Sequence, residues 1–141
     1  MKVLVIIVSY NFEPWIEHCL GSLRLSQYPI DTVVIDNGSK DQTIQRIQKD
    51  YPEIRLLPQN ENLGFGRANN IGMKIALTEG YDFVFLLNQD AWIDSNTIGK
   101  LVELSQSYPH YGILSPVHST GKGDKPDPAL GHNAQIPQLS Q

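Results

Sequence analysis

Runs of consecutive apolar residues alternate along this chain with segments in which apolar residues recur every three to four positions. The continuous runs are typical of strands buried on both faces of a parallel sheet, and the longer period is typical of helices with one buried side. This pattern predicts strands over residues 2–8, 30–36, 53–59, 81–87 and 111–117. It predicts helices over residues 13–27, from Ser39 to about Tyr51, from Gly66 to Glu79, and from Ser95 to Ser107.

Residues at two helix ends carry local signals. Ser39 followed by Gln42 predicts a capping box at the start of the second helix, and Gly80 is expected to end the third. Strands that alternate with helices at this spacing predict an α/β fold, with a mostly parallel sheet and helices on both faces.

Residues 118–141 differ from the rest of the chain. They are rich in Gly, Pro, Gln and Asp and have no apolar periodicity, so we expect a loop or flexible tail after a folded part at residues 1–117. Because the α/β pattern stops without a closing helix, we expect the sheet to be incomplete at its C-terminal end. The chain is then the front part of a longer protein.

Composition excludes some classes of function. The chain has 11 basic and 15 acidic residues, a formal net charge of −4, and no basic cluster, so we expect no nucleic acid partner. No apolar run approaches the roughly 18 residues of a membrane-spanning helix. We therefore expect a cytoplasmic chain, for which peripheral membrane contact stays open. The single cysteine, Cys19, lies in an apolar-periodic stretch and is predicted to be a buried structural thiol.

Polar residues gather where three of the predicted strands end. In an open parallel sheet, ligands bind outside the carboxyl ends of the strands, so these residues are the candidates for function. They are Ser9, Tyr10 and Asn11 after the first strand, Asp36, Asn37, Gly38 and Ser39 after the second, and Asn88, Gln89 and Asp90 after the fourth. Taken singly, each group also fits a simple turn, and Asn11 also fits a helix cap.

Taken together, these residue types suit a nucleotide diphosphate with a metal ion. Asp36 can accept hydrogen bonds from a base or a ribose, and the ring of Tyr10 offers a stacking face. Asp90 is a hard oxygen ligand for Mg²⁺ or Mn²⁺, which neutralises a diphosphate. Arg67, at the start of the third helix, suits a charge-assisted contact to the nucleotide.

The glycines of the third helix start do not form a dinucleotide-binding fingerprint. Gly64 and Gly66 form G-x-G, but Asn69 stands where the third glycine belongs, and the segment follows the third strand rather than the first.

Four segments in this order resemble the family-2 glycosyltransferases with the GT-A fold. They are "VSYN", "VIDNGSKD", "NLGFGRANNIG" and "LLNQDAWI", and the resemblance covers about residues 2–117. The "LNQD" form is most similar to the rhamnosyltransferase-like branch. The resemblance implies inverting transfer of a sugar from a nucleotide-diphospho-sugar to a hydroxyl of a saccharide or lipid-linked acceptor, in surface polysaccharide synthesis.

The resemblance also implies a role for each site residue. Tyr10 stacks near the base with Ser9 beside it, and Asp36 hydrogen-bonds the base ring, with Asn37 where many members have a second Asp. Arg67 contacts the nucleotide. Asn88 binds a ribose hydroxyl, Asp90 binds the metal ion, and Gln89 is a spacer between them.

Two departures leave an alternative open. Asn88 replaces the first Asp of the family's D-x-D motif, and no match to the general base is found. We expect that base beyond Gln141, because Asp124 and Asp127 lie in the predicted tail and are expected to be solvated. The chain is therefore predicted to be the donor-binding half of the enzyme, inactive alone, and the alternative is a non-catalytic glycosyltransferase-like binding domain.

Overall fold

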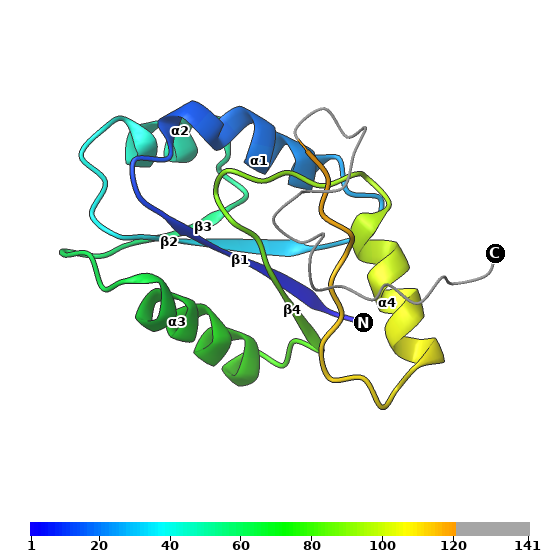
Figure 1. The fold of residues 1–141 in the computed structure, drawn as a ribbon. Helices are drawn as coiled ribbons and strands as arrows, with labels where there is room; N and C mark the ends of the chain where they lie inside the picture. The colour runs from blue at the N-terminus through cyan, green and yellow to red at the C-terminus, as the bar shows by residue number, and fades with distance from the viewer. Residues whose placement is uncertain (121–141) are drawn as a thin grey trace. The chain divides into compact units, whose positions relative to one another are not determined.

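The computed structural model describes residues 1–120 of the chain. The tail predicted at residues 118–141 lies outside this range apart from its first three residues, and so do Asp124 and Asp127. The helices and strands in chain order (Figure 1) are β1 (Val3–Ser9), the 3-10 helix η1 (Glu13–Trp15), α1 (Ile16–Arg24), β2 (Asp31–Asp36), α2 (Thr43–Asp50), β3 (Arg55–Pro58), α3 (Phe65–Thr78), β4 (Phe83–Leu86) and α4 (Thr97–Ser107).

The four strands form one parallel sheet in the order β3-β2-β1-β4. In this register Ser9 at the end of β1 lies opposite Asp36 at the end of β2, and Ile6 of β1 lies opposite Leu86 of β4. The carboxyl ends of β1, β2 and β4 therefore lie along one edge of the sheet. This confirms the predicted α/β fold with a parallel sheet.

Helices cover both faces of the sheet, as predicted (Figure 1). Because side chains of a strand point alternately to its two sides, Val5 and Ile7 of β1 pack in a cluster with α1 and α2, while Leu4 and Ile6 pack in a second cluster with α3. Every residue of β1 is buried or nearly so, which is why its sequence shows no alternation.

The start of α2 differs from the prediction. Its N-cap is Gln42 and carries no side-chain capping bond, so the predicted capping box is wrong. The hydroxyl of Ser39 points back instead and donates to Asp36. The amide of Thr43 donates a hydrogen bond to the carboxylate of Asp41. This bond stabilises the first turn of α2 in place of the predicted cap.

The chain divides into two compact units, Met1–Lys100 and a second that begins at Leu101, inside α4. The strand predicted at residues 111–117 is not formed. Pro116 lacks an N–H for pairing, and Ile113 is 90% exposed, so this apolar run has no buried face to hold it in a sheet. Within residues 1–120 no helix is long and apolar enough to span a membrane.

Candidate functional site

The order in which the chain adds strands to the sheet reverses beside β1. From β1 the chain passes to β2 and β3 on one side, and α3 then carries it back to β4 on the other side of β1. Open α/β sheets bind ligands at the carboxyl ends of the strands next to such a switch point. In this sheet that place lies between the ends of β1 and β4.

A cavity of about 250 Å³, here called the switch-point cavity, occupies this place. It is lined by Val8, Ser9 and Tyr10 from the end of β1, by Phe65 at the start of α3, and by Asn88, Gln89 and Asp90 after β4. Four predicted site residues therefore meet there: Ser9, Tyr10, Asn88 and Asp90. Asp90 is the one charged residue in this lining.

Gln89 joins the two strand ends that form the switch-point cavity. Its side-chain oxygen accepts a hydrogen bond from the amide of Tyr10 at 2.9 Å, and its Nε2 donates to the carbonyl of Tyr10 at 3.2 Å. The prediction that Gln89 is a spacer is therefore wrong, because its side chain accepts one hydrogen bond and donates another, and so fastens the loop after β4 to the main chain after β1.

Asp36 lies beside the cavity rather than in its lining. Its carboxylate is 1% exposed and accepts hydrogen bonds from the Ser9 hydroxyl at 2.7 Å, from the Ser39 hydroxyl at 2.5 Å and from the Ser39 amide at 2.8 Å. Bonds to a carboxylate have charge assistance, and the bond from Ser9 is also buried, where the dielectric constant is low. Asp36 therefore holds the ends of β1 and β2 in a fixed relation.

The loops after β1 and β2 are also joined directly. Asn11 has a positive φ of 48°, a conformation that asparagine tolerates better than most residues. Its amide donates to the Ser39 hydroxyl at 2.8 Å, and its side-chain oxygen accepts from the Lys40 amide at 2.9 Å. Asn11 thus connects two loops and does not cap η1, whose N-cap is Phe12.

Asn37 connects the end of β2 to the start of α3. Its side-chain oxygen accepts from the Leu63 amide at 3.2 Å, and its Nδ2 donates to the Gly64 carbonyl at 3.4 Å. Arg67 follows within the first turn of α3, where it is exposed and does not line the cavity. Asp36, Asn37 and Arg67 therefore lie outside the lining of the cavity, and Asp36 is joined to it through the hydroxyl of Ser9.

The loop that carries Asp90 rests on α1. The Ile93 amide donates to the Ser22 hydroxyl at 3.2 Å, the rings of His18 and Trp92 lie 5.2 Å apart, and the Cys19 thiol lies 3.8 Å from the Asn88 carbonyl oxygen. Burial, and to a smaller extent the negative charge of Asp90, raise the pKa of Cys19 to about 12. The prediction of a buried structural thiol is confirmed, since such a thiol stays protonated.

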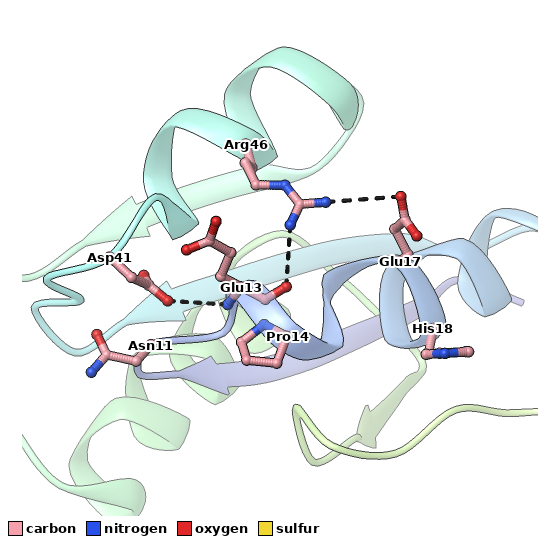
Figure 2. A pocket seen from close by; sticks show the side chains of 7 residues that line it. All are labelled: Asn11, Glu13, Pro14, Glu17, His18, Asp41 and Arg46. Atoms are coloured by element: carbon pink, nitrogen blue, oxygen red, sulfur yellow. Dashed lines mark hydrogen bonds and ion pairs between the residues drawn. The ribbon is translucent and has the colours of Figure 1, made fainter.

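A larger pocket of about 540 Å³ is lined by residues of η1, α1 and α2 and of the loops after β1 and β2 (Figure 2). Three of its charged side chains already have partners in the protein: Arg46 contacts the Glu13 main-chain carbonyl at 3.3 Å and the Glu17 carboxylate at 3.9 Å, and Asp41 accepts from the Glu13 main-chain amide at 3.2 Å. Of the polar residues at the predicted strand ends only Asn11 lines this pocket, and no residue with a predicted nucleotide or metal contact does. We therefore place the candidate site in the smaller switch-point cavity.

Comparison with known proteins identifies relatives of this chain. The family model described as "Glycosyl transferase family 2" matches residues 4–138. An N-acetylglucosaminyl-diphospho-decaprenol L-rhamnosyltransferase from Mycobacterium tuberculosis is 34% identical over 122 residues, which cover 80% of this chain and 40% of that protein.

Two solved structures share the fold. A crystal structure of Staphylococcus aureus TarS 1–349 matches with a TM-score of 0.68 and 26% identity, over 82% of this chain and 38% of that one. The mannosyltransferase PcManGT from Pyrobaculum calidifontis, in complex with GDP-Man and Mn²⁺, matches with a TM-score of 0.64 and 27% identity, over 74% of this chain and 32% of that one. The predicted GT-A fold is confirmed, and the chain spans about two fifths of these relatives or less.

Proposed function

Because this chain belongs to glycosyl transferase family 2, we propose that it is the donor-binding part of an inverting glycosyltransferase. It binds a nucleotide-diphospho-sugar in the switch-point cavity, and the sugar passes to an acceptor hydroxyl. The observation that carries this proposal is that Tyr10 and Asp90, from two different strand ends, line one cavity at the place where open α/β sheets bind ligands.

Each residue at the strand ends has a proposed role. Tyr10 stacks on the base, with Ser9 beside it, and Asn88 bonds a ribose hydroxyl. Arg67 contacts the nucleotide from the first turn of α3. Asp36 and Asn37 belong to the nucleotide site. Their buried side chains are held in place by hydrogen bonds, which supports a role for both residues in positioning the base.

The lining of the cavity fits a divalent ion that arrives with its nucleotide. Within residues 1–120 no three His, Cys, Asp or Glu side chains gather into a metal site, and Asp90 alone supplies a carboxylate to the cavity. Mg²⁺ keeps several waters and often binds through one carboxylate and substrate phosphates. Asp90 would hold Mg²⁺ or Mn²⁺ in this way, and the bound ion would stabilise the negative charge of the leaving diphosphate.

The reaction exchanges one bond at the anomeric carbon for another. The acceptor oxygen attacks from the side opposite the diphosphate, so the configuration inverts as the bond to phosphate breaks, and a general base takes the acceptor proton. We assign that base to no residue between 1 and 120. The name of the mycobacterial relative contains a lipid-linked saccharide, which supports a lipid-linked or saccharide acceptor for this chain as well. The same name supports rhamnosyl or hexosyl transfer in surface polysaccharide synthesis, at the periphery of the membrane.

Thermal unfolding of the chain tests this proposal. Uridine or thymidine diphosphate with Mn²⁺, at about 100 times its Kd, adds about 2.7 kcal/mol of stability, which raises the Tm of a chain of this size by roughly 5–10 °C. Mn²⁺ alone produces no such shift, because one carboxylate holds the ion weakly. The absence of any shift with either nucleotide at millimolar concentration rejects the proposal.

A pair of variants tests the metal site. Asp90→Asn removes the Mn²⁺-dependent part of the shift and keeps the part that the nucleotide produces alone. Asp94→Asn makes the same chemical change at an exposed position outside the cavity lining, and it behaves as the wild-type chain does. Equal behaviour of the two variants means that Asp90 does not hold the ion.

A further inference from the structure

An aromatic residue that the sequence did not single out lies in the lining of the switch-point cavity. Phe65 is the first residue of α3, and 58% of its surface is exposed. It shares this cavity with Tyr10, which is 41% exposed. Single exposed apolar residues are common on proteins, but two partly exposed aromatic residues that line one small cavity can offer two stacking faces to one ligand.

The main chain beside Phe65 is held by hydrogen bonds. Gly64, the residue before it, has φ of 80°, and its amide donates to the side chain of Asn62 at 2.8 Å. The side chain of Asn37 bonds the Leu63 amide and the Gly64 carbonyl. The start of α3 is therefore fixed to the end of β2, and this fixes the place from which the Phe65 ring extends.

The two kinds of side chain in the cavity come from different elements. The aromatic residues come from the end of β1 and the start of α3, and the polar residues Asn88, Gln89 and Asp90 come from the loop after β4. The remaining polar lining residue, Ser9 of β1, is buried and its hydroxyl is already bonded to Asp36. A nucleotide diphosphate has the same division, with a flat base at one end and charged oxygens at the other. The base then suits the aromatic side of the cavity, and the diphosphate suits Asp90.

We propose that Phe65 is a second aromatic wall of the donor site and contacts the base together with Tyr10. This inference rests on the proposed function and adds a binding residue to it. Stacking on an aromatic side chain accepts every base, since each has a π-face. Phe65 therefore supplies affinity for the nucleoside part of the donor and little selection among bases.

Calorimetric titration of the chain compares a ligand that has a base with one that lacks it. Uridine or thymidine diphosphate, whichever binds more tightly, is titrated with Mn²⁺, and pyrophosphate with Mn²⁺ is the ligand without a base. Phe65→Ala weakens nucleotide binding about 5- to 150-fold, the range for loss of one stacked base. It leaves pyrophosphate binding unchanged, and Phe65→Tyr keeps nucleotide binding near the wild-type value.

Leu77→Ala is the matched control, because Leu77 lies on the same helix, is 84% exposed and does not line the cavity. It leaves both affinities unchanged. Unchanged nucleotide binding in Phe65→Ala overturns this inference alone, and so does an equal loss of pyrophosphate binding, which indicates a disturbed site rather than a lost base contact. A wild-type chain that binds neither nucleotide overturns the proposed function and this inference with it.

Discussion

The side-chain amide of Gln89 pairs with both polar groups of the Tyr10 main chain, through hydrogen bonds of 2.9 and 3.2 Å. The two residues follow different strands, β4 and β1, that lie side by side in the sheet. The pairing sets the distance between the loop that carries the Tyr10 ring and the loop that carries Asp90. Gln89 is therefore a positioning residue for the proposed donor site.

Replacing this amide with a carboxylate tests that role. In Gln89→Glu the side chain still accepts from the Tyr10 amide, but it has no proton for the Tyr10 carbonyl and repels it. We expect the free energy of unfolding to fall by about 1–3 kcal/mol and the affinity for the nucleotide to fall as Tyr10 shifts. Urea denaturation and calorimetric titration measure the two effects.

Gln45→Glu is the control for this substitution, because Gln45 is exposed on α2, away from the cavity. It adds the same charge, and we expect stability and nucleotide affinity to stay close to the wild-type values. If Gln89→Glu loses stability but keeps its affinity, the pairing is structural only and Gln89 does not position the site.

The hydrogen bond between Ser9 and Asp36 gives a second prediction. Asp36→Ala removes the acceptor for the Ser9 hydroxyl, which is buried, and for two groups of Ser39. Because buried polar groups without partners are costly, we expect a loss of about 3 kcal/mol or more. In a double-mutant cycle with Ser9→Ala, measured by urea denaturation, the two losses overlap by about 0.5–3 kcal/mol. Strictly additive losses mean that the 2.7 Å contact contributes nothing.

The sequence predicted the fold because its signals are local. The continuous apolar run of β1 and the repeating pattern of α1 each lie within a short segment, and parallel strands bring their polar ends to one edge by geometry alone. That is why Tyr10 and Asp90 were predicted to share a site that the structure brings together. The run at residues 111–117 was misjudged because burial, which its sequence does not reveal, decides whether such a run forms a strand.

What the sequence missed depends on contacts between distant segments. Gln89 meets the main chain of a residue 79 positions away, and no local pattern reveals such a partner. The same holds for Ser39. Its spacing from Gln42 predicted a capping box, but its hydroxyl donates a hydrogen bond to Asp36 instead. Phe65 lies within the segment "NLGFGRANNIG", but only the fold shows that it lines the same cavity as Tyr10.

The hydroxyl of Tyr81 predicts how stability changes at high pH. It donates to Asp31 at 2.8 Å, and burial, this bond and the charge of Asp31 raise its pKa from 10.0 to about 12. The native state therefore keeps a proton that the unfolded chain releases above pH 10. The stability that this raised pKa contributes is fully present below pH 10 and is lost as pH rises toward 12. Because solvent screens this exposed bond, the slope stays below the roughly 1.4 kcal/mol per pH unit of one whole proton.

Tyr81→Phe isolates this effect. The variant loses the bond to Asp31 and about 1 kcal/mol at pH 8, but its stability falls less steeply than that of the wild type between pH 10 and 12. Urea denaturation across this pH range measures both slopes. Tyr28→Phe is the control, because it also removes a tyrosine hydroxyl that donates an exposed hydrogen bond, here to the Met1 carbonyl at 3.0 Å. Parallel slopes for the wild type and Tyr81→Phe contradict the prediction.

The contact between Gly72 of α3 and Ile6 of β1 sets how closely the helix approaches the sheet. A Cβ at position 72 would lie 2.6 Å from Cγ2 of Ile6, which no relaxed structure accepts. Gly72→Ala gains about 1 kcal/mol of helix propensity, but the overpacking costs more, and we expect a net loss of about 1–3 kcal/mol. Gly66→Ala, on the same helix with nothing within 4 Å, is the control and keeps or raises stability.

Ile6→Ala costs about 2–5 kcal/mol alone and less when combined with Gly72→Ala, because the added methyl group then fills part of the cavity. Equal effects of the two glycine substitutions in urea denaturation mean that α3 shifts freely on the sheet and that residue 72 does not set their spacing.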